Sequence, residues 1–114
     1  MGTNNFWPIL DNLVLNNELI IDRPKGSCHP RYTTSIYPFD YGYLKGTKSG
    51  DDEGIDVWIG SLPNKTVKAI ICTVDEQKQD LEIKLLVGCS KEDCQQIIAY
   101  HNKGQQIGIL IERP

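Results

Sequence analysis

The sequence predicts an α+β domain that is mainly β, a small closed or partly open barrel with one helix near each end. Five or six short segments carry strand patterns and are separated by turn residues. Two further segments repeat apolar residues at helical spacing. A chain of 114 residues, 39% hydrophobic and 24% charged, has room for one core. We therefore expect residues 1–114 to form a single domain.

Two segments are expected to be helices because their apolar residues lie three and four positions apart. In residues 4–15 this stripe consists of Phe6, Ile9, Leu10, Leu13 and Val14. The second helix follows Ser90, because Ser90 and Asp93 have the spacing of a capping box. Its apolar side consists of Cys94, Ile97, Ile98 and His101, and Gly104 ends it. On that side His101 is expected to be a partly buried structural histidine.

Strands are expected at 18–22, 55–59, 67–74, 81–87 and 106–111, with short strands and tight turns in the tyrosine-rich run 26–47. The segments 67–74 and 81–87 flank a polar loop, which predicts a hairpin. In 55–59, alternation places Asp56 and Trp58 on one face, opposite three aliphatic side chains.

Charge and cysteine content argue against several classes of function. Twelve Lys and Arg against fifteen Asp and Glu give a net charge of −3, so no broad basic surface is expected for nucleic acid or an anionic membrane. Neither a membrane helix nor a signal peptide is indicated, and the expected location is the cytoplasm. The four cysteines contain no C-x-x-C pair, which favours free thiols over a zinc site.

The acidic residues are the most informative feature of the sequence. Segment 50–57 holds four acids within six residues, and on its own it could be a solvated acidic turn. However, aspartate is uncommon inside a strand such as 55–59, and two more aspartates bracket the next hairpin loop. The acids that could converge on one cavity are Asp51, Glu53, Asp56, Asp75 and Asp80. An all-oxygen set suits Mg²⁺ or Mn²⁺ and phosphoryl transfer.

A phosphate site also needs positive charges and hydroxyl groups. The candidate cations are Arg23, Lys25, Arg31, Lys45, Lys48 and Lys84, and the candidate phenols are Tyr37, Tyr41 and Tyr43. Each lysine or arginine taken singly is more often a solvated surface residue.

Three motifs in this order resemble the soluble (family I) inorganic pyrophosphatases. Residues 51–57, DDEGIDV, resemble the family's metal signature, Asp-x-Asp-Pro-hydrophobic-Asp. Residues 37–43, YPFDYGY, are similar to its Tyr-Pro-x-Asn-Tyr-Gly-Tyr segment, and Asp75 with Asp80 resembles the aspartate pair that completes the metal cluster. The resemblance covers roughly residues 18–102. It implies a five-stranded OB-like barrel with flanking helices, a homo-oligomer, and Mg²⁺-dependent hydrolysis of pyrophosphate to two orthophosphates, with Mn²⁺ as the alternative metal.

The resemblance also implies roles for individual residues. Asp51, Asp56 and Asp80 would bind a first metal ion, Asp56 would bridge to a second, and Asp75 with Asp80 would hold the metal that arrives with substrate. Glu53 would accept a proton from the attacking water and belong to the metal set. Tyr41 would lie at the floor of the site, Tyr100 would bind phosphate, and Asp22 would lie near the metals.

Several positions depart from the family pattern. Glu53 is one methylene longer than the family's aspartate, and Glu82 stands where the family has a phosphate-binding lysine. Lys84 points to the same face by strand alternation and is a candidate replacement. The segment 22–37 is too short for the family's cation-bearing hairpin, so Arg23, Lys25 and Arg31 become the candidates for phosphate binding. Two alternatives stay open: a module that binds metal and phosphate without turnover, and a hydrolase of another small phosphoanhydride.

Overall fold

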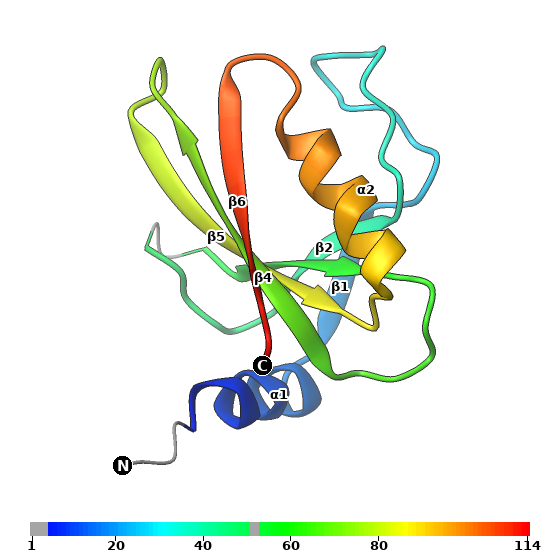
Figure 1. Ribbon diagram of the computed structural model, residues 1–114, viewed down its shortest axis with the longest axis vertical. Coiled ribbons are helices and arrows are strands. Elements are labelled where there is room, and N and C mark those ends of the chain that lie inside the picture. Colours follow the sequence, from blue (N-terminus) through cyan, green and yellow to red (C-terminus); the bar gives the residue numbers. More distant parts are fainter. Residues whose placement is uncertain (1–4, 51–52) are drawn as a thin grey trace.

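The computed structural model describes residues 5–50 and 53–114, and this part of the chain forms one six-stranded sheet with two helices (Figure 1). In chain order the elements are α1 (Phe6–Asn16), β1 (Leu19–Arg23), β2 (Asp40–Leu44), β3 (Ile55–Ile59), β4 (Val67–Asp75), β5 (Asp80–Val87), α2 (Lys91–His101) and β6 (Gln106–Glu112). The strand order is β1-β2-β3-β5-β4-β6. The pair β3 and β5 is parallel, and every other neighbouring pair is antiparallel.

The mainly β, α+β prediction is confirmed, but the five-stranded barrel is not. The described strands number six, and the sheet is open with β1 and β6 at its edges. Closure would require these two edges to pair, and among the described strands β1 and β6 do not pair with each other. In the tyrosine-rich run only β2 and an isolated bridge between Cys28 and Ile36 form, because turns occupy the rest.

Both predicted helices are present. At the start of α2 the Ser90 hydroxyl accepts the Asp93 N–H at 3.1 Å, and the Asp93 carboxylate accepts the Ser90 N–H at 3.0 Å, which is the expected capping box. Asn5 precedes α1 but makes no side-chain cap hydrogen bond. In the described part of the chain, neither helix has the length and apolar character needed to cross a membrane.

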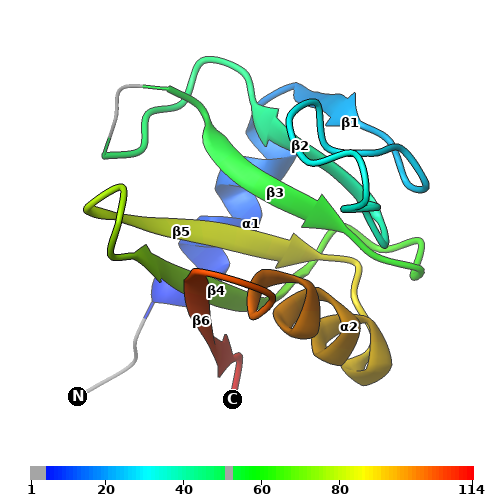
Figure 2. The same cartoon turned by 90° about the horizontal axis from the view of Figure 1, so that it is seen from above.

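The two helices pack on opposite faces of the sheet (Figure 2). Alternation along β3 sends Val57 to the face that α1 covers and Trp58 to the face that α2 covers. Under α1, the core includes Val14, Leu44, Val57, Val67, Ile70, Leu85 and Val87. Under α2, it includes Tyr37, Phe39, Trp58, Ala69, Ile71, Leu86, Cys89, Cys94 and Ile97. The α2 face carries the polar residues of interest.

Candidate active site

One end of the α2 face is polar. Towards the β4–β5 turn, β5 contributes Lys84, Glu82 and Asp80 at alternate positions of this face. In the neighbouring strands, Asp56 of β3 lies beside Lys84, and Asp75 of β4 pairs with Asp80. The apolar core under α2 lies at the opposite end of these strands, so three strands each contribute acids to the end of this face that lies away from the core.

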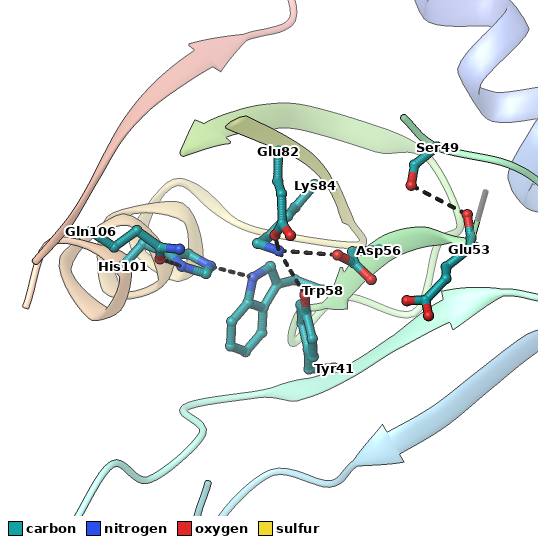
Figure 3. A network of polar contacts seen from close by, with 9 residues as sticks. All are labelled: Tyr41, Ser49, Glu53, Asp56, Trp58, Glu82, Lys84, His101 and Gln106. Atoms are coloured by element: carbon teal, nitrogen blue, oxygen red, sulfur yellow. Dashed lines mark hydrogen bonds and ion pairs between the residues drawn. The ribbon is translucent and has the colours of Figure 1, made fainter. Parts of the chain in front are cut away.

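Lys84 lies at the centre of this polar end and is only 4% exposed. Its ammonium donates to Asp56 Oδ2 at 3.1 Å, to Glu82 Oε1 at 2.8 Å and to the Tyr41 hydroxyl at 2.9 Å (Figure 3). A lysine ammonium has three N–H donors, so these contacts use all of them. The result is a compact cluster of one ammonium, two carboxylates and one phenol, which we call the Lys84 cluster.

The environment keeps both Lys84 and Tyr41 protonated. Burial alone would lower the pKa of Lys84, but Tyr41, Asp56 and the hydrogen bond to Glu82 outweigh burial and raise it. Burial also raises the pKa of Tyr41, although the charge of Lys84 opposes this shift. At neutral pH the cluster therefore holds a fixed positive charge beside a neutral phenol.

Asp75 and Asp80 face one another at the last pair of the β4–β5 hairpin. Asp75 Oδ1 accepts the Lys78 N–H at 3.1 Å, which orders the turn. Both aspartates border a surface hollow of about 590 Å³ at the end of the hairpin, which Val74, Leu81 and Ile107 also line. The structure thus brings two of the predicted metal ligands together at the base of the turn, where Asp75 is only 8% exposed.

Three cations lie close enough to His29 to act on it electrostatically: Arg23 at the end of β1, Arg31 in the loop before β2, and Lys78 in the β4–β5 turn. Burial lowers the pKa of His29, and the three positive charges lower it further. The neutral ring accepts the Arg31 N–H at Nδ1, at 3.0 Å. We call these three residues the cation group, and such a group is suited to bind an anion.

The sequence predicted two members of the cation group, Arg23 and Arg31, but missed Lys78. Its position between Asp75 and Asp80, two expected site residues, was the available signal.

Aromatic rings fill the space between the polar end and α2. Tyr41 and Trp58 have ring centroids 4.7 Å apart, and Tyr37 lies 5.7 Å from Tyr41 and 5.4 Å from Tyr100. The Tyr100 hydroxyl accepts a hydrogen bond from Ser35 at 2.9 Å. The packing of these rings fixes the Tyr41 ring, so that its hydroxyl lies within hydrogen-bond distance of Lys84.

His101 is a structural histidine, as predicted from the sequence. Its Nε2 accepts the indole N–H of Trp58 at 3.0 Å, and its Nδ1 lies 2.9 Å from Gln106 Oε1 (Figure 3). Burial lowers the pKa of His101 to about 4. The ring is therefore neutral at pH 7, with the proton on Nδ1 facing Gln106.

Solved structures of inorganic pyrophosphatases have a similar fold. The enzyme from Helicobacter pylori matches with a TM-score of 0.58 and 14% identity, covering 82% of this chain and 81% of its own. The enzyme from Neisseria gonorrhoeae matches with a TM-score of 0.56 and 16% identity, covering 78% and 77%. No family model and no curated protein sequence matches the chain. The chain has the pyrophosphatase fold.

Within this pyrophosphatase fold, some predicted site residues lie outside the polar end or outside the described residues. Asp51 belongs to residues 51–52, which the structure does not describe. Glu53 precedes β3, and its carbonyl accepts the Ser49 N–H at 2.8 Å. Lys25 places its ammonium 5.3 Å from the centre of the Phe39 ring. Asp22 lies at the bulge of β1 and is exposed.

The described carboxylates offer a metal ion two different environments. Within residues 5–50 and 53–114, no three His, Cys, Asp or Glu side chains gather as a ligand set. Asp56 already contacts the Lys84 ammonium. Asp75 and Asp80 fit an ion that is bound by one or two carboxylates and completes its shell with water and phosphate oxygens, as Mg²⁺ commonly does.

Proposed function

We propose that this chain hydrolyses inorganic pyrophosphate to two orthophosphates at the polar end of the α2 face. One observation carries the proposal: in the β4–β5 turn the Lys78 N–H donates to Asp75, which pairs with Asp80, and the charge of Lys78 acts on His29 together with those of Arg23 and Arg31. The turn thus connects candidate metal-binding and anion-binding groups. The pyrophosphatase fold supports pyrophosphate as the first substrate to test.

In the proposed reaction, the cation group holds the phosphates and offsets their charge. Water forms a new P–O bond at one phosphorus while the bridging P–O bond breaks, and the bonding electrons leave with the second orthophosphate. Glu53 is the proposed acceptor of the water proton. Tyr100 is proposed to bind phosphate, and Asp56 and Tyr41 to define the floor beside Lys84.

Mg²⁺ is the proposed cofactor, with Mn²⁺ as the alternative. Asp75 and Asp80 would hold it, and a divalent ion would supply neutralisation of phosphate charge and activation of water. Nucleic acid and membranes are not among the proposed partners, and the protein is proposed to act as a homo-oligomer in the cytoplasm.

The test is orthophosphate release from pyrophosphate by the pure chain, with Mg²⁺ and then with EDTA. Asp80→Asn should reduce the rate at least tenfold, because it removes one of the two carboxylates proposed to hold the metal. Glu92→Gln is the matched control, an exposed acid in the first turn of α2, and should keep the rate within twofold. Equal rates in both variants would refute the role of Asp80.

A binding module is the second candidate, and the Lys84 cluster favours it. All three donors of the Lys84 ammonium are already used, so this lysine has no donor left for phosphate. Calorimetric titration with pyrophosphate separates the two candidates. A saturating isotherm with no orthophosphate formed would indicate binding alone, whereas continuous heat with orthophosphate would indicate turnover. Release of orthophosphate from a different phosphoanhydride, and not from pyrophosphate, would point to the other hydrolase alternative.

A further inference from the structure

Lys84 has the surroundings of a bound cation. Its ammonium is almost fully buried and lies 2.8–3.1 Å from oxygens of Asp56, Glu82 and Tyr41. These oxygens come from three neighbouring strands, so the sheet itself holds them in place (Figure 3). The burial and the full use of its donors distinguish this lysine from a mobile surface side chain.

A divalent ion on Asp56 would compete with this ammonium. Mg²⁺ needs oxygens at about 2.0–2.1 Å in a nearly octahedral shell. The Glu82 carboxylate and the Tyr41 hydroxyl, which flank Asp56, are already bound to Lys84. A divalent ion on Asp56 would lie within a few ångströms of the ammonium, and two cations at that distance repel each other. Because Asp56 Oδ2 and Glu82 Oε1 already bind the ammonium, a metal ion would have to displace Lys84 to use these two oxygens.

We propose that Lys84 is the resident cation of Asp56 and takes the place of a divalent ion there. This differs from the expectation that Asp56 bridges two metal ions. Any metal used by the protein is then bound at Asp75 and Asp80, and phosphate oxygens of the substrate join its shell when substrate is present. The inference refines the proposed function, but it concerns the substrate-free protein, so it can be tested without turnover.

In the first experiment the substrate-free full chain is titrated with Mn²⁺, and binding is measured by isothermal titration calorimetry. Asp56→Asn should leave the Mn²⁺ affinity within twofold of wild type, because Asp56 holds Lys84 and not a metal. Lys84→Met should bind one additional Mn²⁺, because it frees Asp56 and Glu82. Lys65→Met, in the exposed loop after β3, is the matched control and should behave as wild type. A tenfold loss of Mn²⁺ affinity in Asp56→Asn, or no additional Mn²⁺ in a folded Lys84→Met, would overturn the assignment.

A second measurement covers the case in which Lys84→Met does not fold. A buried ammonium with three partners exchanges its protons slowly, so a ¹⁵N-detected signal of the Lys84 Nζ should be visible in the wild-type chain. We expect this signal to persist unchanged when Mg²⁺ is added. Its loss or shift with saturating Mg²⁺ would show that the metal displaces Lys84. Absence of pyrophosphate hydrolysis, with these results as expected, would refute the proposed function and leave the Lys84 assignment standing.

The face of the sheet that packs against α1 also carries exposed aliphatic side chains. α1 covers only part of this face, because a helix of 11 residues is about 16 Å long. Beyond it lie six aliphatic side chains on three adjacent strands, 41–74% exposed: Val74, Leu81, Ile83, Ile107, Ile109 and Ile111. They form one continuous surface, because Val74 pairs with both Leu81 and Ile107, and Cys72 pairs with both Ile83 and Ile109. We call this surface the aliphatic patch.

The patch has the character of a subunit interface. None of its six residues is charged, and depletion of charge marks the centre of such interfaces. Six half-exposed aliphatic side chains amount to several hundred Å², a large part of the ~800 Å² that each partner buries in a standard interface. An aliphatic sheet surface can pack against its own copy, since face-to-face packing of two sheets buries both. We infer that a second copy of this chain covers the aliphatic patch.

Sedimentation velocity of the full chain tests this interface. Wild type should sediment as a dimer or larger assembly at micromolar concentration. Ile109→Lys should reduce the mass of the assembly at least by half, while its circular dichroism spectrum stays that of wild type. Ile36→Lys, at an isoleucine that is also about half exposed but lies in the loop before β2, is the matched control and should assemble as wild type. A monomeric wild type, or an Ile109→Lys variant that assembles normally, would overturn the inference.

Discussion

Acidification should destabilise this fold through His101 before most carboxylates are protonated. The pKa of His101 is about 4 in the folded protein, against 6.5 for an ordinary histidine. Above pH 6.5 the ring is neutral in both states, so the full stability is present. As the pH falls below 6.5, the unfolded chain takes up a proton that the folded chain excludes, and stability is lost down to about pH 4.

The size of this loss in stability follows from the difference between the folded and unfolded pKa values of His101. Each pH unit between the two pKa values changes the free energy of unfolding by about 1.4 kcal/mol. Between pH 6.5 and pH 5, the His101 contribution is therefore about 2 kcal/mol. The structural cause is a buried ring, 7% exposed, whose Nε2 accepts a hydrogen bond from Trp58 that the protonated ring could not accept.

Urea unfolding, followed by tryptophan fluorescence at several pH values, measures this effect. His101→Gln keeps a hydrogen-bond acceptor near Trp58 but cannot titrate, so its stability should fall about 2 kcal/mol less than wild type between pH 6.5 and pH 5. His29→Gln, at the chain's second histidine, is the control and should retain most of the wild-type pH dependence. An equal pH dependence in His101→Gln and wild type would refute the reasoning.

Three further predictions follow from single contacts. Asp93→Ala removes a carboxylate that accepts hydrogen bonds from Ser61 and from the N–H of Ser90, the N-cap residue of α2. This change should lower the free energy of unfolding by about 2 kcal/mol. Glu92→Ala, at an exposed position in the same turn, should change it little. Gly42→Ala should destabilise the fold severely in a thermal melt, because its Cβ would collide with the neighbouring strand's backbone. Arg31→Met should raise the KM for pyrophosphate about tenfold through loss of one phosphate contact, in steady-state kinetics with wild type as the reference.

Local patterns predicted the elements because each pattern depends only on neighbours in the chain. Alternation in residues 55–59 placed Asp56 and Trp58 on one face, and the spacing of Ser90 and Asp93 located the start of α2. The same alternation along β5 placed Lys84 on the face of Glu82. These predictions required no knowledge of distant contacts.

The arrangement of the site was harder to predict because it depends on pairing between distant segments. Parallel pairing of β3 with β5 sets Asp56 beside Lys84, and nothing within either strand specifies that register. The electrostatic effect of Lys78 and Arg23 on His29 likewise depends on how a turn, an edge strand and a loop are placed in space. The open edges of the sheet have the same origin, since closure is a property of the whole sheet.

The most direct test of the proposed hydrolysis is ³¹P NMR of pyrophosphate incubated with the full chain and Mg²⁺. The pyrophosphate signal should be replaced by orthophosphate alone, two for each pyrophosphate consumed, and EDTA should stop the conversion. A folded chain that leaves the pyrophosphate signal unchanged, with Mg²⁺ and with Mn²⁺, would contradict the proposed hydrolysis.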